Sequence, residues 1–239
     1  MRELSAIDIR FLVKELQQAV GSRIDKLYAP HPEEIVLQLR KTGSPKSIIR
    51  CVVPDVIYLS SMKEEMPERP SGWCNSLRNL LEGAKIVSVI QPKSERVVVF
   101  HVEKRDTTSH LYLEFYGKGN IVVTDEGDTI IAVLHTITHK DREVSQGVVY
   151  TLPQGPDAFH MTESEFVSLI SSAGKNASTA LSSAIGLGSF YAKELCARAG
   201  IDAKEMLTIA HTKKLHSALT TLLGQEPSPV ASIADGGVI

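Results

Sequence analysis

The stretch 177–201, ASTALSSAIGLGSFYAKELCARAGI, decides the fold of the second half of the chain. Apolar residues recur three and four positions apart on both sides of Gly186-Leu187-Gly188, which predicts two short helices joined by a tight turn. Glycine suits such a turn because it adopts positive φ without strain. The order hydrophobic-Gly-hydrophobic-Gly is typical of a helix-hairpin-helix motif. Its second helix, which we expect to open with Ser189 near the N-cap, can offer free amides to a phosphate. The alternative is a plain αα-hairpin whose glycines serve only the turn.

The sequence around this stretch is rich in alanine, serine and leucine and carries helical spacing throughout. It predicts helices at 162–172, 177–185, 190–199 and 203–223, and so a small all-α domain over 157–224. Residues 225–239 have no pattern of their own, and we expect them to be a linker or a truncated end.

The first half has a different period. A helix is expected at 5–20, capped by Ser5, with Asp8 in its first turns and with Ile7, Phe11, Leu12 and Leu16 on one face. The pattern then alternates with a period of two, and short breaks separate the segments. It predicts strands at 23–29, 34–41, 47–53, 56–60, 85–90, 96–102, 110–115, 120–124 and 129–138, with one helix at 72–82. The expected fold class is α+β: an antiparallel β-rich domain with flanking helices over 1–156, followed by the helical domain.

Composition restricts the possible functions. With 26 Lys+Arg against 28 Asp+Glu the formal net charge is −2, so any nucleic acid contact must use a local patch. The three cysteines are far apart and form no CxxC pair, which predicts no metal, no cofactor and a reduced, cytoplasmic protein. No apolar run is long enough to cross a membrane.

The sequence offers no catalytic motif, so we expect a protein that is not an enzyme. No GxSxG elbow is present, and no pair of carboxylates is marked as special. The densest polar group is QPKSER at 91–96, in which Glu95 and Arg96 open a strand. A guanidinium at a strand edge can bind a phosphate or a base edge. The alternative is a surface ion pair, worth about 0–1 kcal/mol and without a function.

Several separated stretches together resemble the N-terminal module of NFACT proteins, the family once named after fibronectin-binding protein A. They are AIDIR at 6–10, GSRIDKLY at 21–28, CNSLRNLL at 74–81, QPKSERVVVF at 91–100, GKGNI at 117–121, REV at 142–144 and GVVYTLP at 147–153. The hairpin follows in the expected order, and the first two stretches are similar to the archaeal type. The family's coiled coil and C-terminal RNA-binding domain are not found in 1–239, so the resemblance implies an N-terminal fragment.

The resemblance implies a function that composition does not show. NFACT proteins act in ribosome-associated quality control: they bind stalled large ribosomal subunits and recruit charged tRNA for an untemplated C-terminal tail. The family needs an Asp near the first helix and an Asp-Arg pair before a strand. Asp8 and Arg96 match these positions, whereas Glu95 stands where Asp is usual. The expected partners are therefore tRNA and the large subunit with its rRNA.

The expected RNA contacts come from both domains. Asp8, Glu95 and Arg96 would form one face of the β-rich domain, and Gly186, Gly188 and Lys193 would contribute from the hairpin. The chain after Tyr150 has 6 Lys+Arg against 8 Asp+Glu, which favours packing over electrostatic attraction there.

Two other functions remain open at this point. In fold the module resembles the N-terminal domain of formamidopyrimidine-type DNA glycosylases, which attack with an N-terminal proline amine assisted by the next glutamate. This chain begins Met1-Arg2-Glu3 and lacks that proline. The family's older name points to a fibronectin-binding adhesin, against which the absence of an export signal argues.

Overall fold

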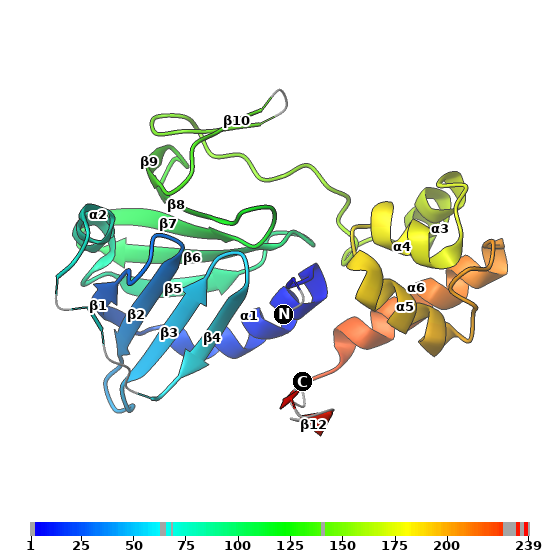
Figure 1. Cartoon of the computed structure of the whole chain (residues 1–239), viewed down its shortest axis with the longest axis horizontal. Helices are drawn as coiled ribbons and strands as arrows, with labels where there is room; N and C mark the ends of the chain where they lie inside the picture. Colours follow the sequence, from blue (N-terminus) through cyan, green and yellow to red (C-terminus); the bar gives the residue numbers. More distant parts are fainter. Residues whose placement is uncertain are drawn as a thin grey trace.

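The structure is a computed structural model that describes residues 3–62, 66–67, 69–139 and 142–226, together with the backbone of 233–234 and 237–238. Met1, Arg2 and most of the expected end at 225–239 therefore lie outside the described residues, as does part of the loop expected at 62–71. Figure 1 shows a strongly curved sheet on one side of the molecule and a group of helices on the other.

The sheet has nine antiparallel strands in the order β4-β3-β2-β1-β5-β6-β7-β8-β9, as the meander pattern predicts. The sheet consists of two meanders joined by a short junction between β1 and β5, in which Arg23 pairs with Lys85 and backbone hydrogen bonds connect residues 21–24 with 83–86. The nine strands are β1 Arg23–Tyr28, β2 Glu34–Arg40, β3 Ser47–Val52, β4 Val56–Ser60, β5 Lys85–Ile90, β6 Val97–Lys104, β7 Thr107–Glu114, β8 Asn120–Asp125 and β9 Ile130–Val133.

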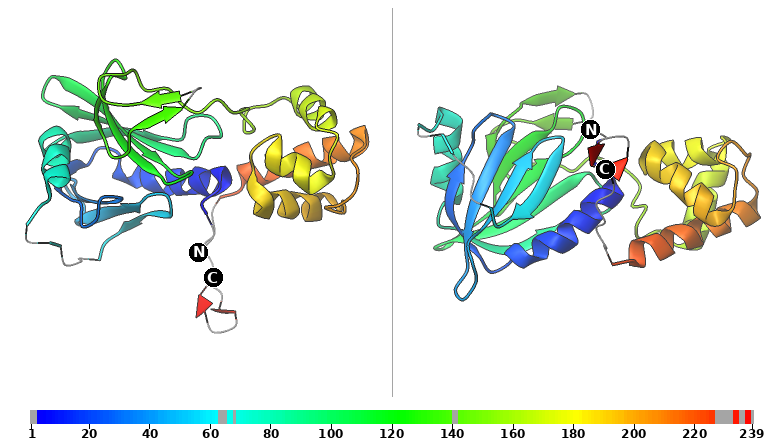
Figure 2. Two further views of the ribbon diagram at one scale, coloured as in Figure 1. Left: turned by 45° about the horizontal axis from the view of Figure 1, so that its top comes forward. Right: turned by 60° about the horizontal axis from the view of Figure 1, so that its bottom comes forward.

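The two meanders face each other across the main core (Figure 2). Alternate residues of the strands fill it because successive side chains of a strand point to opposite faces. Two helices border this core: α1, Ala6–Leu16, contacts β4 of one meander and β5 and β6 of the other, and α2, Gly72–Leu81, lies on β1. A 3-10 turn, η1, Gln17–Ala19, leads from α1 into β1.

Four helices enclose a second core: α3 Glu163–Ser172, α4 Ala177–Ser183, α5 Gly188–Ala199 and α6 Ile209–Gly224. Leu181 and Ile185 before the glycine turn, and Ala192, Leu195 and Cys196 after it, are all buried, as their spacing predicts, whereas Ala184, which has the same spacing, is only partly buried. The mixed α+β class with a large antiparallel sheet is therefore confirmed. A separate helix-hairpin-helix domain, and the division of the chain at residue 156, stay predictions.

α1 belongs to both cores, and here the predicted single apolar face is wrong. Ile9 and Leu16 lie in the sheet core, whereas Ile7 is fully buried in the helical core, with Phe11 packed beside it. The amino end of α1 points toward α4 and α5 (Figure 1). Because the helix is bordered by two apolar surfaces rather than one, its apolar residues divide between them.

Two predicted elements have bounds that differ from the expectation. The strand expected at 129–138 is two strands: β9 stays in the large sheet, and β10, Ile137–His139, pairs instead with β11, Arg142–Val144. The helix expected at 203–223 begins only at Ile209, where Thr208 caps it. The backbone carbonyls of Ala203 and Glu205 instead accept hydrogen bonds from amides in the first turn of α4. A second two-stranded pairing joins β12, Ile233–Ala234, with β13, Gly237–Val238.

Candidate functional site

The first turn of α1 is closed by a capping box, in which Ser5 is the cap that the sequence predicts. Ser5 is the N-cap, and its hydroxyl accepts from the Asp8 amide at 3.2 Å. In return, Asp8 Oδ2 accepts from both the amide and the hydroxyl of Ser5, each at 2.8 Å. One carboxylate oxygen of Asp8 is thus used within its own helix.

The other oxygen of Asp8 reaches the helical part of the molecule. The hydroxyl of Tyr191, in the first turns of α5, donates to Asp8 Oδ1 at 2.9 Å. A hydrogen bond to an ionised carboxylate is roughly twice as strong as a neutral one. Asp8 therefore joins α1 to α5, and its carboxylate accepts from protein donors on both oxygens.

The turn 91–96 packs against the same end of α1. The side-chain amide of Gln91 donates to the carbonyls of Ala6 and Glu95, each at 2.8 Å. Arg96 Nη1 lies 2.9 Å from Glu3 Oε2, and the two side chains are 31% and 74% exposed. Arg96 thus reaches the segment that precedes α1, although 93 positions separate the pair.

Glu95 points the other way, toward the segment that leads to the helical part. It is half-buried, and a Cβ on Gly155 would lie 2.8 Å from Glu95 Oε1, so a side chain there would push the carboxylate away from the Gly155 amide. Burial raises the pKa of Glu95, although a hydrogen bond from the Gly155 amide and nearby cations act in the opposite direction. Ser94 reinforces the contact, because its hydroxyl donates to the Pro156 carbonyl and accepts from the Ala158 amide, both at 2.9 Å.

These contacts bring Arg96 opposite the glycine turn across a pocket of about 520 Å³. Gly186 and Gly188 have φ of +69° and +75°, the left-handed region that favours glycine. The pocket is lined by Glu3, Leu4, Ser5, Arg96, Ser182, Gly186, Leu187, Gly188, Ser189 and Phe190. It lies between the two parts of the molecule, beside the amino end of α1.

The start of α5 differs from the prediction. The helix opens at Gly188 with Leu187 at the N-cap, which provides no side-chain hydrogen bond, so Ser189 is not the cap. Gly188 is already the first residue of α5, so Ser189 lies inside the first turn of the helix. Phe190 then projects beside the pocket with 55% of its surface exposed, and its ring meets that of Tyr191 edge-on at 5.2 Å.

The six residues expected to contact RNA fall into three groups. Arg96, Gly186 and Gly188 line the pocket. Asp8 is hydrogen-bonded to Ser5 and to Tyr191, and Glu95 contacts Gly155, so both residues lie where the sheet part meets the segment 155–191. Lys193 is exposed on α5 and does not line the pocket. Their role in RNA binding stays a prediction.

Sequence reasoning missed Glu3, Phe190 and Tyr191 as members of this site. Glu3 and Phe190 line the pocket, and Tyr191 binds Asp8. The only local signal was the position of the two aromatic residues directly after the glycine turn. Their roles depend on residues almost the whole chain away, which no local pattern reveals.

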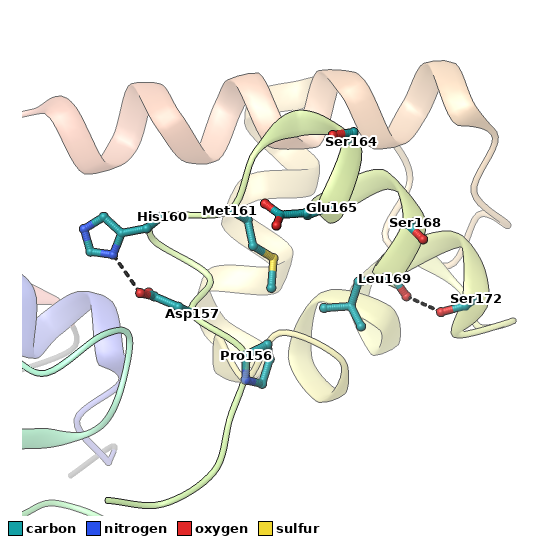
Figure 3. A pocket seen from close by; sticks show the side chains of 9 residues that line it. All are labelled: Pro156, Asp157, His160, Met161, Ser164, Glu165, Ser168, Leu169 and Ser172. Carbon is teal, nitrogen blue, oxygen red and sulfur yellow. Dashed lines mark hydrogen bonds and ion pairs between the residues drawn. The ribbon is translucent and has the colours of Figure 1, made fainter.

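A second, open pocket of about 770 Å³ lies along α3 (Figure 3). Its carboxylates are used locally: Asp157 pairs with His160 at 2.8 Å, and Glu165 accepts from the amide and hydroxyl of Thr162, the N-cap of α3. Lysine and arginine are absent from its lining, so it does not suit an anion. The lining is Pro156, Asp157, His160, Met161, Ser164, Glu165, Ser168, Leu169 and Ser172.

Within the described part of the chain, no group of three or more His, Cys, Asp or Glu side chains could hold a metal ion. The three cysteines are buried and unpaired with one another. Among the helices that the structure describes, none is both long and apolar enough to pass through a bilayer.

Comparison with known proteins gives one consistent result. Residues 5–234 match the family described as NFACT N-terminal and middle domains. The archaeal Rqc2 homolog aRqcH of Methanocaldococcus jannaschii is 30% identical over 93% of this chain, which covers 35% of that protein. Ribosome quality control complex subunit 2 of Saccharomyces cerevisiae is 28% identical over 61% of this chain and 14% of that protein.

A solved structure agrees with the sequence matches. The N-terminal part of the fibronectin/fibrinogen-binding protein from Streptococcus suis superposes with a TM-score of 0.73 at 21% identity, covering 90% of this chain and 84% of that one. This likeness concerns the fold. The chain spans about a third of the length of its archaeal relative, and with a family match across nearly all of its residues it belongs to the NFACT family.

Proposed function

We propose that this chain is the tRNA- and ribosome-binding part of a factor for ribosome-associated quality control in the cytoplasm. The factor would bind large subunits that carry a stalled chain and recruit charged tRNA for untemplated tailing. Two observations support a role in ribosome quality control: the family match, and the yeast relative's name as a ribosome quality control complex subunit. We propose a binding module rather than an enzyme.

The pocket between the sheet and the helical part carries the proposal. Arg96 supplies a guanidinium, which suits bidentate binding of phosphate, and the opening turn of α5 faces it across the pocket. Phe190 adds an exposed ring at the rim, where an unstacked base can pack. A cation, backbone amides and an aromatic ring around one hollow are the groups that single-stranded RNA loops require.

The test is binding of unfractionated tRNA by fluorescence anisotropy across a potassium chloride series. We expect Arg96→Ala to weaken binding about tenfold and to reduce the log–log salt slope by about 0.7–0.9, since one phosphate contact is lost. Arg198→Ala is the matched control, because Arg198 also pairs with a glutamate at 2.7 Å but lies at the other end of α5. Equal affinity and slope for the two variants would contradict the proposal.

The two earlier alternatives have their own tests. A glycosylase would form a covalent adduct with an abasic-site duplex under borohydride reduction, and an adhesin would bind purified fibronectin. In this structure Glu3, which would assist a glycosylase, is paired with Arg96. The proposed function would be overturned if tRNA binding is absent and either a trapped adduct or fibronectin binding is observed.

A further inference from the structure

Cations gather on the outer face of the sheet, away from the pocket. Arg23 of β1 pairs in register with Arg40 of β2 on one side and with Lys85 of β5 on the other. Residues that are directly opposite on neighbouring strands project to the same face. Since Ile24 is buried in the core, the neighbouring Arg23 points outward, and all three cations are exposed.

Two more lysines extend this row. Lys26 is exposed further along β1, and Lys41 follows Arg40 directly. We call Arg23, Lys26, Arg40, Lys41 and Lys85 the basic patch. Among the described residues, the carboxylates beside it that no cation outside the patch pairs with are Asp25, 3.5 Å from Arg40, and Glu103, which is opposite Lys85. Glu82, which accepts from the Leu27 amide, is paired with Arg78 at 3.4 Å. Five cations against two carboxylates leave a local charge of +3 on a chain whose net charge is −2.

The anchoring of the patch preserves its charge. Arg23 Nη1 donates to the Gly83 carbonyl at 3.0 Å, and Lys41 Nζ donates to the Val20 carbonyl at 2.8 Å. A carbonyl fixes the position of a cation without neutralising it, as a carboxylate would. Like charges opposite each other on a sheet destabilise it, so folding alone does not favour this row. A polyanion that covers the row would relieve that repulsion.

The patch and the pocket lie at opposite ends of α1. The pocket includes Ser5 at the amino end, and the chain enters β1 and Arg23 directly after α1 and η1. The 11 residues of α1 span about 16 Å, so one nucleotide cannot contact both places. Across the strands, Arg40, Arg23 and Lys85 cover about 10 Å, two interstrand spacings. A row of this kind suits a phosphate backbone rather than a single anion.

We propose that the basic patch is a second RNA-binding surface, which contacts the phosphate backbone of double-helical RNA without reading its sequence. The inference rests on the proposed function, because an RNA at the pocket would continue toward this face. The surface would add affinity through counterion release, and the pocket would add selectivity.

The experiment compares two triple variants with equal loss of charge. Arg23→Gln/Arg40→Gln/Lys85→Gln removes the row, and Lys175→Gln/Lys204→Gln/Lys214→Gln removes three exposed lysines of the helical part. The probe is a fluorescent 20-base-pair RNA hairpin, titrated from 50 to 200 mM potassium chloride. We expect the first variant alone to lose two to three units of log–log slope and at least tenfold in affinity at the lower salt. Thermal unfolding of both variants checks that they fold.

Each outcome decides the matter. Equal salt slopes for the two folded triple variants would overturn the proposal that the basic patch binds RNA. The proposed function would still stand if Arg96→Ala weakens tRNA binding. If the Arg23/Arg40/Lys85 variant loses binding to the RNA hairpin while Arg96→Ala leaves tRNA binding unchanged, the basic patch binds RNA and the proposed role of the pocket is contradicted. Binding of phosphatidylserine vesicles by the wild type, lost with the row and accompanied by no RNA binding, would assign the surface to a membrane and overturn the inference. If the row variant fails to fold, the single variant Lys85→Gln, set against Lys204→Gln, must lose about 0.9 units of slope.

Discussion

The hydroxyl of Tyr191 donates to Oδ1 of Asp8 at 2.9 Å, and this bond joins residues 183 positions apart in the chain. Ser5 occupies the other oxygen of Asp8. The carboxylate that the family resemblance marks as necessary thus connects the sheet and helical parts on either side of the pocket.

A double-mutant cycle separates a connecting role of Asp8 from direct RNA contact. Tyr191→Phe and Asp8→Asn should each lower the free energy of unfolding by about 1.5–3 kcal/mol, since each weakens a hydrogen bond to a charged group. In tRNA binding, Asp8→Asn should cost little once Tyr191 is already Phe, because both changes break the same connection. Additive losses in affinity would show instead that Asp8 contacts the RNA itself. Denaturant unfolding and anisotropy provide the two measurements.

Removing Glu3 should strengthen RNA binding. Glu3 neutralises Arg96 in the free protein, and its side chain is 74% exposed, so the pair itself contributes little to stability. Glu3→Gln should raise tRNA affinity about two- to fivefold and leave the midpoint of thermal unfolding unchanged, because an RNA phosphate no longer competes with a carboxylate. The gain must vanish in the Arg96→Ala background. A gain that persists there would mean that Glu3 acts by general repulsion.

Gly119 should tolerate no side chain, because the turn before β8 packs against the turn after β3. A Cβ there would lie 2.7 Å from Val53 Cβ and 2.8 Å from the Pro54 nitrogen, and φ is +74°. Gly119→Ala should cost about 3 kcal/mol or more in denaturant unfolding.

Gly147 is the matched control, with φ of +86° and open space around its Cβ position. Gly147→Ala should cost only about 1 kcal/mol, the penalty for positive φ alone. Similar costs at the two sites would show that the turns separate readily.

Acid should destabilise the outer face of β6 and β7. Burial lowers the pKa of His101, and the neighbouring His110 lowers it further. Burial alone would raise the pKa of Asp128, but hydrogen bonds from Tyr112 and His110 lower it overall. In both cases the unfolded chain binds the proton more readily than the folded chain, so acidification favours unfolding.

Stability should therefore fall as pH drops below about 6.5, where an ordinary histidine titrates, and fall again near pH 4, where an ordinary aspartate does. His101→Gln should flatten the first decline, and His31→Gln, at an exposed turn, should not. Urea midpoints between pH 4 and 8 measure both variants. A first decline that is unchanged in His101→Gln would assign it to other groups.

Much of the local structure could be predicted from the sequence. Alternation of apolar residues identified the strands, and Ser5 with Asp8 identified the start of α1. The strand expected at 129–138 was wrong because periodicity does not show which sheet a strand joins. The helix expected from 203 was wrong because Ala203 and Glu205 use their carbonyls to cap α4, a partner that helical spacing cannot reveal.

The sequence by itself determined the period of most elements, the Ser5 cap of α1, the glycine turn and the family. Only the tertiary structure decided that Ile7 faces a different core from Ile9, that Arg96 meets Glu3, and that three cations of the sheet stand in one row. The physical reason is that hydrogen bonding and burial along one helix or strand repeat with its own period and leave a trace in the sequence. Contacts between distant elements depend on how the sheet curves and where α1 packs, and they leave no periodic trace.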